Sequence, residues 1–394
     1  MKRVFTRNQS RALAYAVLLL LAMPLAAGTT RIWVLNNGSE GKDSIHVIDT
    51  ATNKVVQTID GIGKPHGVTF SPDGKLAYVT SEVDDENLYV IDTQTGKILR
   101  KSALSGRRAN VPTITKDGKR LLVCIGAARD ERGLVNPTLG GGGLDVVDTS
   151  SLKVLKTLSG FTEGHDCYTT EDGKYFVSGS GQTLVVTDAK TFEPLWTLPF
   201  KGRVATVGIG VAPDGSTDRL YVVEIFNPVR EFAVVDFAAK KEVSRVQLPE
   251  QPSGFKLGPP LTRRNRIPTH GAAVSPNGKM FAVVSRGSNA VFFYTLPDLK
   301  FVGYVPAPTI ESATPPANGS DPGWVTWTPD SKTVYVPCAA AGVVQAIDVK
   351  SLKEVARIPV GKQPDHVWTL ALPAELSSGK PVKTSMKGKS EAKR

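Results

Sequence analysis

The stretch that decides the fold is residues 63–80, which read GKPHGVTFSPDGKLAYVT. A small-residue loop with a histidine leads into an apolar run, a Pro-Asp-Gly turn and a second apolar run. Pro-Asp-Gly between two such runs is typical of a tight turn between antiparallel strands. The stretch therefore predicts a β-hairpin with His66 at the start of its first strand.

The same hairpin pattern recurs along the chain. The later copies are NVPTITKDGKRLLVCI from residue 110, HDCYTTEDGKYFVSGS from 165, VGIGVAPDGSTDRLYVVE from 207, HGAAVSPNGKMFAVVS from 270 and GWVTWTPDSKTVYVPC from 323. Most copies are followed by a second hairpin signature, such as LYVIDTQTGKILR at 88–100. Four short strands in each repeat of roughly 40 to 60 residues are typical of a β-propeller blade.

The two ends of the repeat region complement each other. RIWVLNN at 31–37 and SIHVIDTATNKVVQTI at 44–59 supply the last three strands of a blade that lacks its first. DHVWTLAL at 365–372 supplies a first strand alone. We expect these segments to pair, because pairing closes the ring without a free edge. The six internal copies and this composite unit predict an all-β, seven-bladed β-propeller.

The 394-residue chain carries basic segments at both ends of the predicted propeller. Residues 1–28 join four basic residues to an apolar run and a small-residue exit, which predicts a cleaved secretory signal peptide. Residues 376–394 lack apolar periodicity and predict a basic, disordered tail. The leader holds four and the tail five of the eleven net positive charges, so that residues 29–375, the predicted propeller, carry only +2.

This charge distribution bears on location and partners. A nearly neutral body argues against nucleic-acid binding, which needs a basic stripe on the folded part. The leader predicts export to the periplasm or secretion. We expect a monomer with no transmembrane segment after signal cleavage, whose partner is a small molecule or a periplasmic protein.

A family resemblance rests on the repeated segments. AYVTS, LYVVE and VYVPC, with their Gly-x-Pro-His-Gly and Ser-Pro-Asp-Gly punctuation, resemble the YVTN family of β-propeller repeats over nearly the whole mature chain. Among its members, the chain is similar to exported propellers associated with quinone-cofactor (PQQ) dependent alcohol catabolism. The d1-type haem propellers of the nitrite reductase group are a more distant likeness. The resemblance implies a fold and an accessory role, but a fold does not fix a function.

The first strand of each propeller blade lines the axis, so its opening residue lies at one end of that axis. The opening residues are His66, Asn110, His165, Val207, His270 and Gly323, with Asp365 or His366 in the composite blade. We predict that the four histidines among them converge there. Neutral imidazoles are good ligands for copper, iron or haem, and the sequence does not choose among these cofactors. The structural alternative is that each imidazole bonds a backbone carbonyl of the next blade.

Further residues are predicted at the same end, where second strands finish and interblade loops lie. Three long segments, 126–143, 249–269 and 306–323, should rise from it, and long loops in compact folds are usually functional. The predicted ligand-binding residues at this end are Lys64, Arg108, Glu224, Arg266, Arg286 and Trp324.

Two classes of function follow from this site. The first is a binding or accessory protein that holds a small ligand, cofactor or protein partner without turning it over. The second is a metal- or haem-linked oxidoreductase that uses the histidines, with propeller lactonases and lyases as a hydrolytic variant. We favour binding, because the sequence contains no complete catalytic constellation, phosphate-binding loop or nucleophile elbow.

Overall fold

The computed structural model describes residues 29–38, 43–127, 141–158, 161, 163–250, 254–256, 268–313 and 315–372. The predicted leader, the basic tail, Arg266 and most of the segment 126–143 therefore lie outside the described residues. Within the described part, no helix is both long and apolar enough to cross a membrane.

The described residues form eight β-sheets, seven of four strands and one of three. Six of the four-stranded sheets use four consecutive strands in chain order. The first two of these sheets consist of β4 (Pro65–Phe70), β5 (Leu76–Ser81), β6 (Leu88–Asp92) and β7 (Ile98–Ser102), and of β8 (Arg108–Ile114), β9 (Arg120–Ala127), β10 (Gly141–Asp148) and β11 (Val154–Leu158). The next two consist of β12 (Gly164–Thr169), β13 (Tyr175–Ser180), β14 (Thr183–Asp188) and β15 (Pro194–Pro199), and of β16 (Arg203–Val211), β17 (Thr217–Ile225), β18 (Glu231–Asp236) and β19 (Lys241–Gln247). The last two consist of β21 (Ala272–Val274), β22 (Met280–Ser285), β23 (Ala290–Thr295) and β24 (Phe301–Pro306), and of β27 (Thr326–Trp327), β28 (Thr333–Cys338), β29 (Val343–Asp348) and β30 (Lys353–Pro359). A single turn of 3-10 helix (Ala339–Ala341) follows β28.

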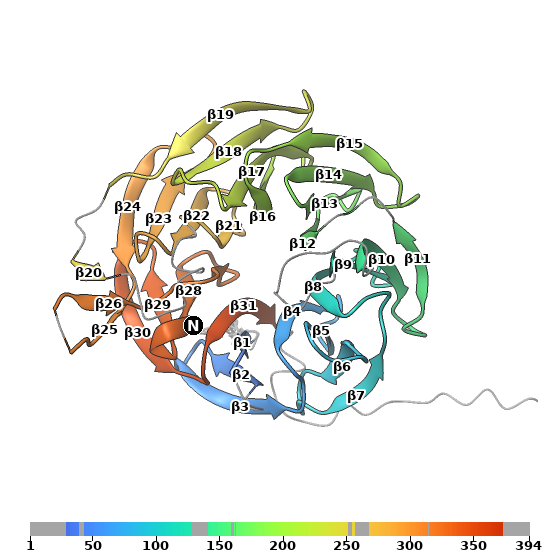
Figure 1. Ribbon diagram of the computed structural model, residues 1–394, viewed down its shortest axis with the longest axis horizontal. Coiled ribbons are helices and arrows are strands. Elements are labelled where there is room, and N and C mark those ends of the chain that lie inside the picture. Colours follow the sequence, from blue (N-terminus) through green and yellow to red (C-terminus); the bar gives the residue numbers. More distant parts are fainter. Residues whose placement is uncertain are drawn as a thin grey trace, which may run out of the picture.

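The two ends of the described chain share the seventh four-stranded sheet. Its order is β3 (Lys54–Asp60), β2 (Ser44–Asp49), β1 (Thr30–Asn36) and β31 (Pro364–Ala371). Strands β1 and β31 are antiparallel, and their register sets Trp33 opposite Trp368. The predicted pairing of the N-terminal strands with the last strand is confirmed. Figure 1 shows the sheets arranged around a central axis as in a β-propeller, with β4, β8, β12, β16, β21 and β31 innermost.

The predicted long segments 249–269 and 306–323 meet in the three-stranded sheet. It consists of β20 (Phe255–Lys256), β26 (Ala317–Gly319) and β25 (Thr309–Ile310), with β20 parallel to β26. Figure 1 shows this small sheet at the periphery of the ring, beside β24 and β30.

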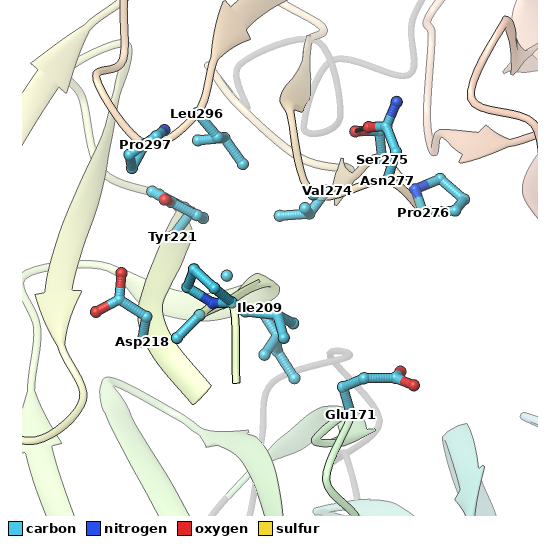
Figure 2. Close-up of a pocket in the computed structure, with 15 residues that line it drawn as sticks. Glu171, Ile209, Asp218, Tyr221, Val274, Ser275, Pro276, Asn277, Leu296 and Pro297 are labelled. Atoms are coloured by element: carbon cyan, nitrogen blue, oxygen red, sulfur yellow. Dashed lines mark hydrogen bonds between the residues drawn. The ribbon is translucent and has the colours of Figure 1, made fainter. Parts of the chain in front are cut away.

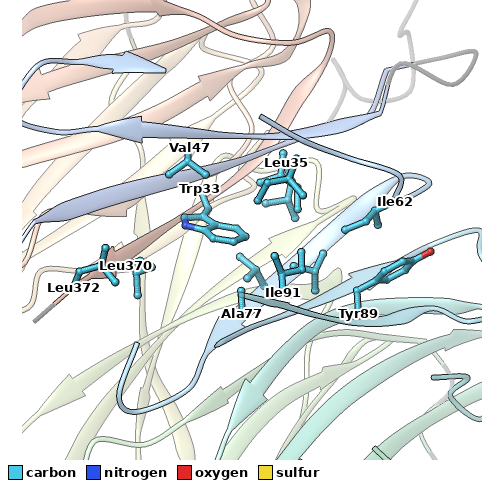
Figure 3. Packing of buried hydrophobic residues seen from close by; sticks show 13 residues of the cluster. Trp33, Leu35, Val47, Ile62, Ala77, Tyr89, Ile91, Leu370 and Leu372 are labelled. Atoms are coloured by element: carbon cyan, nitrogen blue, oxygen red, sulfur yellow. The ribbon is translucent and has the colours of Figure 1, made fainter. Parts of the chain in front are cut away.

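Neighbouring sheets bury their faces against each other. Trp33, fully buried on β1, packs in a cluster that joins the closing sheet to the β4–β7 sheet (Figure 3). The cluster includes Leu35 and Val47 from one sheet, and Val79 and Ile91 from the other. A four-stranded sheet cannot bury both faces alone, so these shared clusters hold each sheet to the next.

Each outermost strand of the seven four-stranded sheets carries a β-bulge at the same position. In β3, for example, the pairing passes from Val47↔Gln57 to Ile48↔Val55 and skips Val56. The skipped residues are all aliphatic and exposed: Val56, Leu99, Leu155, Leu195, Val243, Val302 and Val355. A bulge twists an edge strand away from further pairing, so the ring protects each of these outer edges by the same device.

The Pro-Asp-Gly turns lie together at one end of the axis, which we call the turn end. Asp73 accepts hydrogen bonds from the Lys75 N–H at 3.1 Å and the Ser71 hydroxyl at 2.7 Å. Gly74 follows with φ of +71°, a left-handed conformation that glycine adopts at little cost. The opposite end, where the inner strands begin, is the histidine end.

Candidate functional site

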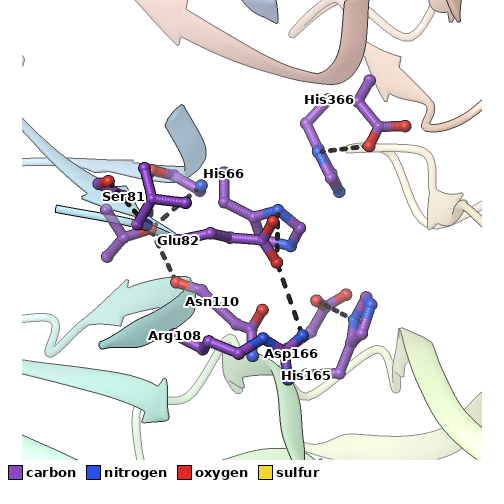
Figure 4. A network of polar contacts seen from close by, with 12 residues as sticks. His66, Ser81, Glu82, Arg108, Asn110, His165, Asp166 and His366 are labelled. Carbon is purple, nitrogen blue, oxygen red and sulfur yellow. Dashed lines mark hydrogen bonds and ion pairs between the residues drawn. The ribbon is translucent and has the colours of Figure 1, made fainter. Parts of the chain in front are cut away.

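Four histidines meet at the histidine end of the axis, as Figure 4 shows in part. The ring centres of His66 and His366 are 4.3 Å apart, and those of His66 and His165 are 6.1 Å apart. His270 completes the circuit, at 6.0 Å from His165 and 6.4 Å from His366. His66, His165 and His366 lie on β4, β12 and β31, His270 lies just before β21, and each residue is at most 7% exposed. The structure thus brings together the four predicted histidines.

Bulges at the start of two inner strands fall at these histidines. In β4 the register passes from Pro65↔Ser81 to Gly67↔Thr80, so that His66 is skipped. In β12 it passes from Gly164↔Ser180 to Cys167↔Ser178, which leaves His165 and Asp166 outside the register. In β31 the skipped residue is Asp365, and His366 pairs with Leu35. A bulge re-aims the side chain of the extra residue, and bulges are common next to functional sites. The repeat pattern predicted where the histidines converge but did not predict these bulges.

The glycines that follow two of the histidines let the inner strands approach each other. A Cβ atom on Gly67 would lie 2.6 Å from the Val111 Cα of the adjacent inner strand. A Cβ atom on Gly271 would lie 2.6 Å from the Trp324 Cα. Only glycine fits positions where another backbone comes this close. In the repeated His-Gly pair, the close packing of the strands therefore requires the glycine but does not require the histidine.

Two of the imidazoles have a defined tautomer. His270 Nδ1 lies 3.1 Å from the Gly323 carbonyl oxygen, which can only accept, so the nitrogen carries the proton. His165 Nδ1 lies 2.6 Å from the Asp166 carboxylate, and Asp166 also accepts the Tyr168 hydroxyl at 2.5 Å. When neutral, both rings then keep the lone pair on Nε2. For His270, the predicted bond to the next sheet's backbone carbonyl is confirmed.

His66 is held differently. Neither of its ring nitrogens has a hydrogen-bond partner, although the residue is only 7% exposed. Its Nδ1 lies 3.7 Å from a Glu82 carboxylate oxygen. Burial lowers the pKa of His66, and the nearby Glu82 carboxylate opposes this shift. Burial and the positive charge of Arg286 together take the pKa of His270 well below the usual value. Both rings therefore favour the neutral form, which offers a lone pair to a ligand.

Trp324 covers one side of the histidine circuit. Its ring centre is 4.6 Å from that of His366, 5.5 Å from His270 and 6.4 Å from His165. Trp368 lies 5.6 Å from His366 on the same side. Trp324 was predicted to be a ligand-binding residue, and the structure places it against the imidazoles themselves.

A chain of ionic contacts borders the circuit beside His66. Arg108 lies 3.7 Å from both Glu82 and Glu163, and Arg203 lies 3.3 Å from Glu163. Burial alone raises the pKa of Glu82, but His66 and Arg108 outweigh it and the net pKa is lowered. Glu82 is therefore a carboxylate at neutral pH.

A second ionic cluster lies on the other side, beside His366. The Arg286 guanidinium is 3.1 Å from Asp321 and 3.0 Å from Asp365, and all three side chains are at most 3% exposed. This cluster joins the β21–β24 sheet to the segment before β27 and to β31. A buried guanidinium held by two carboxylates is rigid, and removing one partner leaves an uncompensated charge.

The remaining predicted residues have other positions. Lys64 is exposed at the rim, where its carbonyl oxygen accepts the Glu82 N–H at 3.2 Å and its charge helps to lower the pKa of Glu82. Glu224 is buried, but its carboxylate accepts the Gly202 N–H at 2.6 Å and pairs with Arg245, so it is engaged within its own sheet and loops. Of the predicted ligand-binding residues, Arg108, Arg286 and Trp324 border the circuit, and Arg266 lies outside the described residues.

Asp166 and Arg203 are residues of this site that sequence reasoning did not assign to it. Asp166 directly follows His165, and this adjacency was the one available signal. Arg203 opens an inner strand, but nothing in the repeat indicates that its side chain crosses to Glu163. Within the described part of the chain, no three His, Cys, Asp or Glu side chains are already arranged to hold a metal ion.

A separate hollow of about 660 Å³ lies at the turn end, between β16 and β21 (Figure 2). Tyr221, Ile209, Val274 and Pro297 form much of its wall. Asn277 at its edge is engaged in its own turn, since it accepts the Lys279 N–H at 3.0 Å. Two carboxylates also line the hollow, but Glu171 pairs with Lys116 at 3.2 Å and Asp218 pairs with Arg219 at 2.9 Å, so both are already engaged.

Comparisons with known proteins support the fold. The chain matches no protein-family model and no curated protein sequence. The structure is similar to Kuenenia stuttgartiensis hydrazine synthase, with a TM-score of 0.60 and 16% identity over 80% of this chain and 97% of that one. It is also similar to the dihydro-haem d1 dehydrogenase NirN in complex with DHE, with a TM-score of 0.54 and 16% identity over 89% of this chain and 76% of that one.

At this level of identity the likeness shows a β-propeller fold and nothing finer. The resemblance to YVTN repeats and the link to quinone-cofactor alcohol catabolism have no family match behind them, and they stay predictions.

Proposed function

We propose that this chain is an exported, seven-bladed β-propeller that binds a small ligand at its histidine end and serves as an accessory protein in the periplasm or outside the cell. The observation that carries the proposal is the convergence of His66, His165, His270 and His366 on one buried spot. The turns of the repeat do not need these imidazoles, since other sheets have asparagine, alanine or glycine near the corresponding position. A binding role explains why distant parts of the chain bring the same donor type to one place.

Binding without turnover is favoured by how the neighbouring charges are used. Arg286 is neutralised by Asp321 and Asp365, and Arg108 is shared between Glu82 and Glu163. General acid–base catalysis needs a proton-transfer group free to meet the substrate. Here the charged groups mainly hold one another and the imidazoles, which suits a rigid binding site.

A thermal-shift survey of the mature, tag-free protein tests this proposal. The panel contains divalent metal chlorides, pyrroloquinoline quinone, haemin and small carboxylic acids. A ligand at 100 times its Kd stabilises the folded state by about 2.7 kcal/mol, which shifts the Tm of a domain this large by several degrees. We expect at least one member to do so, and the shift to vanish in the His66→Ala/His366→Ala double variant.

The matched control is His46→Ala, because His46 lies on β2, away from the inner strands. That variant should keep the whole shift. If no member of the panel stabilises the protein, or if the double variant responds like the wild type, the histidine end is not the binding site.

The second candidate is a metal- or haem-linked oxidoreductase, and the likeness in fold to NirN, whose structure is a complex with DHE, makes it worth testing. The described residues do not fit a macrocycle placed among the imidazoles. The rings of His66 and His366 lie 4.3 Å apart, Trp324 packs on His366 at 4.6 Å, and all are nearly buried. The absorption spectrum of the purified protein decides this point. A Soret band that His366→Ala removes would favour the haem-linked enzyme over the accessory protein.

A further inference from the structure

We propose that the ligand of the histidine end is a single copper(II) ion, bound by imidazole nitrogens of His66, His165, His270 and His366. This inference rests on the proposed function, since it names the ligand of the same site. Its steps are the spacing of the rings, the orientation of their nitrogens, the local charge and the donor type.

The spacing of the rings suits one shared ion. A metal that binds imidazole nitrogens at about 2 Å brings the centres of neighbouring rings to about 4.5–5 Å from one another. The four neighbouring spacings in the circuit are 4.3, 6.1, 6.0 and 6.4 Å. The spacing of the His66 and His366 rings is already close to that value, and the other three spacings exceed it by about 1–2 Å. This is why the described side chains do not yet form a metal-binding group.

The second step concerns the nitrogens that face away from the protein scaffold. Metal-binding histidines usually donate the other ring N–H to a carboxylate or a backbone carbonyl, which fixes the tautomer. His165 has such a contact with Asp166, and His270 has one with the Gly323 carbonyl. Each ring is thereby left with its lone pair on Nε2. His66, buried and without a hydrogen-bond partner at either nitrogen, lacks the contact that a purely structural histidine would have.

The third step is the charge around the circuit. Five carboxylates, Glu82, Glu163, Asp166, Asp321 and Asp365, surround it together with only three guanidiniums, Arg108, Arg203 and Arg286. Lys64 and Lys362 add positive charge at the rim, but both are exposed and screened by water. With neutral imidazoles, these five carboxylates and three guanidiniums sum to a net charge of −2. The site therefore favours a cation over an anionic ligand.

The fourth step is the identity of the cation. Imidazole nitrogens suit copper, zinc, nickel and iron, whereas calcium and magnesium prefer oxygen ligands. Among the divalent first-row ions, a site of a given nitrogen donor set binds copper(II) most tightly, so the four imidazoles favour copper(II).

The test is a copper titration of the metal-stripped, tag-free mature protein, followed by calorimetry and electron paramagnetic resonance. We expect one copper(II) ion per chain, with hyperfine structure from at least three imidazole nitrogens. The His66→Ala/His366→Ala double variant should bind at least about 100-fold more weakly, and Asp166→Asn, which alters the support of His165, about 10-fold more weakly. His46→Ala should bind like the wild type.

Circular dichroism and the Tm of each metal-free variant show whether it is folded, and Asp166→Asn keeps all four imidazoles if the double variant unfolds. Copper that binds with equal affinity to wild type and a folded double variant, or a spectrum without nitrogen coupling, would overturn the inference. If copper fails while another member of the thermal-shift panel stabilises the wild type through these histidines, the copper assignment is wrong and the proposed function stands. If nothing binds, both are wrong.

Discussion

The turn end and the histidine end of the axis are built by the same strands, yet they use polar residues in opposite ways. At the turn end the aspartates of the repeated turns accept hydrogen bonds from their own turn, as Asp73 does from Ser71 and Lys75. At the histidine end the contacts join different sheets: Arg286 reaches Asp365 across 79 positions of the chain. The repeated end specifies the fold locally. The end that differs from sheet to sheet is where we propose that the ligand binds.

The largest expected effect comes from breaking the long-range contacts of the histidine end. Arg286→Met leaves Asp321 and Asp365 buried without their cation, which should lower the free energy of unfolding by about 3–5 kcal/mol. The matched turn-end variant is Arg219→Met, whose guanidinium is one-third exposed and lies 3.0 Å from Asp236. It should cost no more than about 1 kcal/mol.

Urea unfolding of both arginine variants, monitored by tryptophan fluorescence, gives the two values. Equal losses would mean that the two ends do not differ in how their charges support the structure. A loss for Arg219→Met that exceeds the loss for Arg286→Met would reverse the comparison.

Two glycines give a somewhat smaller contrast. In Gly271→Ala the new Cβ atom would lie 2.6 Å from the Trp324 Cα, so an inner strand must shift, at a cost of about 1–3 kcal/mol or more. In Gly278→Ala at the turn end nothing lies within 4 Å of the new atom. Its cost of about 1 kcal/mol comes only from the left-handed backbone, with φ of +69°.

Thermal unfolding and ligand binding separate the two glycine variants. Gly271→Ala should also weaken binding at the histidine end, because Trp324 packs on the imidazoles. Gly278→Ala should bind as the wild type does, and a binding defect in it would show that the ends are coupled through the inner strands.

The third prediction concerns pH in the metal-free protein. The pKa values of His66 and His270 are lowered in the folded state, so the unfolded chain takes up protons first as the pH falls below 6.5. Stability is therefore full above pH 6.5 and decreases below it, by at most about 1.4 kcal/mol per pH unit for each histidine. Urea midpoints between pH 7 and pH 5 should fall less in the His66→Gln/His270→Gln variant. A parallel fall in both proteins would exclude this origin.

The repeat allowed most of the fold to be predicted, because turn residues mark where strands end. The composite sheet followed from the incomplete units at the two ends, and the structure confirms that pairing. The convergence of the histidines was also predicted from their common position. That position was wrong in one sheet: Val207 was expected to open the inner strand, but the bulge of β16 falls at Ala205, because this hairpin has a longer turn and a second bulge.

The contacts between sheets were beyond sequence reasoning. Glu224 occupies a position at which a ligand-facing carboxylate was expected, but Arg245, on the fourth strand of the same sheet, draws it away. A repeat gives the height of a residue along a strand. It does not give the direction of the side chain where a bulge intervenes, or the partner that an arginine reaches two strands away.

The smallest expected effect tests whether each turn at the turn end is stabilised only by its own residues. One turn of the chain already carries asparagine in place of the aspartate. Asn277 replaces the aspartate in one turn and accepts the same two bonds, from Ser275 Oγ at 2.7 Å and the Lys279 N–H at 3.0 Å. Asp73→Asn should therefore change the free energy of unfolding at pH 7 by no more than about 0.5 kcal/mol.

Hydrogen bonds from Ser71 and Lys75 lower the pKa of Asp73 against the opposing effect of burial, so the wild type loses that contribution only in acid, below the usual aspartate pKa of 3.8. At pH 7 the urea midpoints of the two proteins should be alike. At pH 3 Asp73→Asn should be more stable relative to the wild type. A large loss at pH 7 would mean that this carboxylate supports more than its own turn.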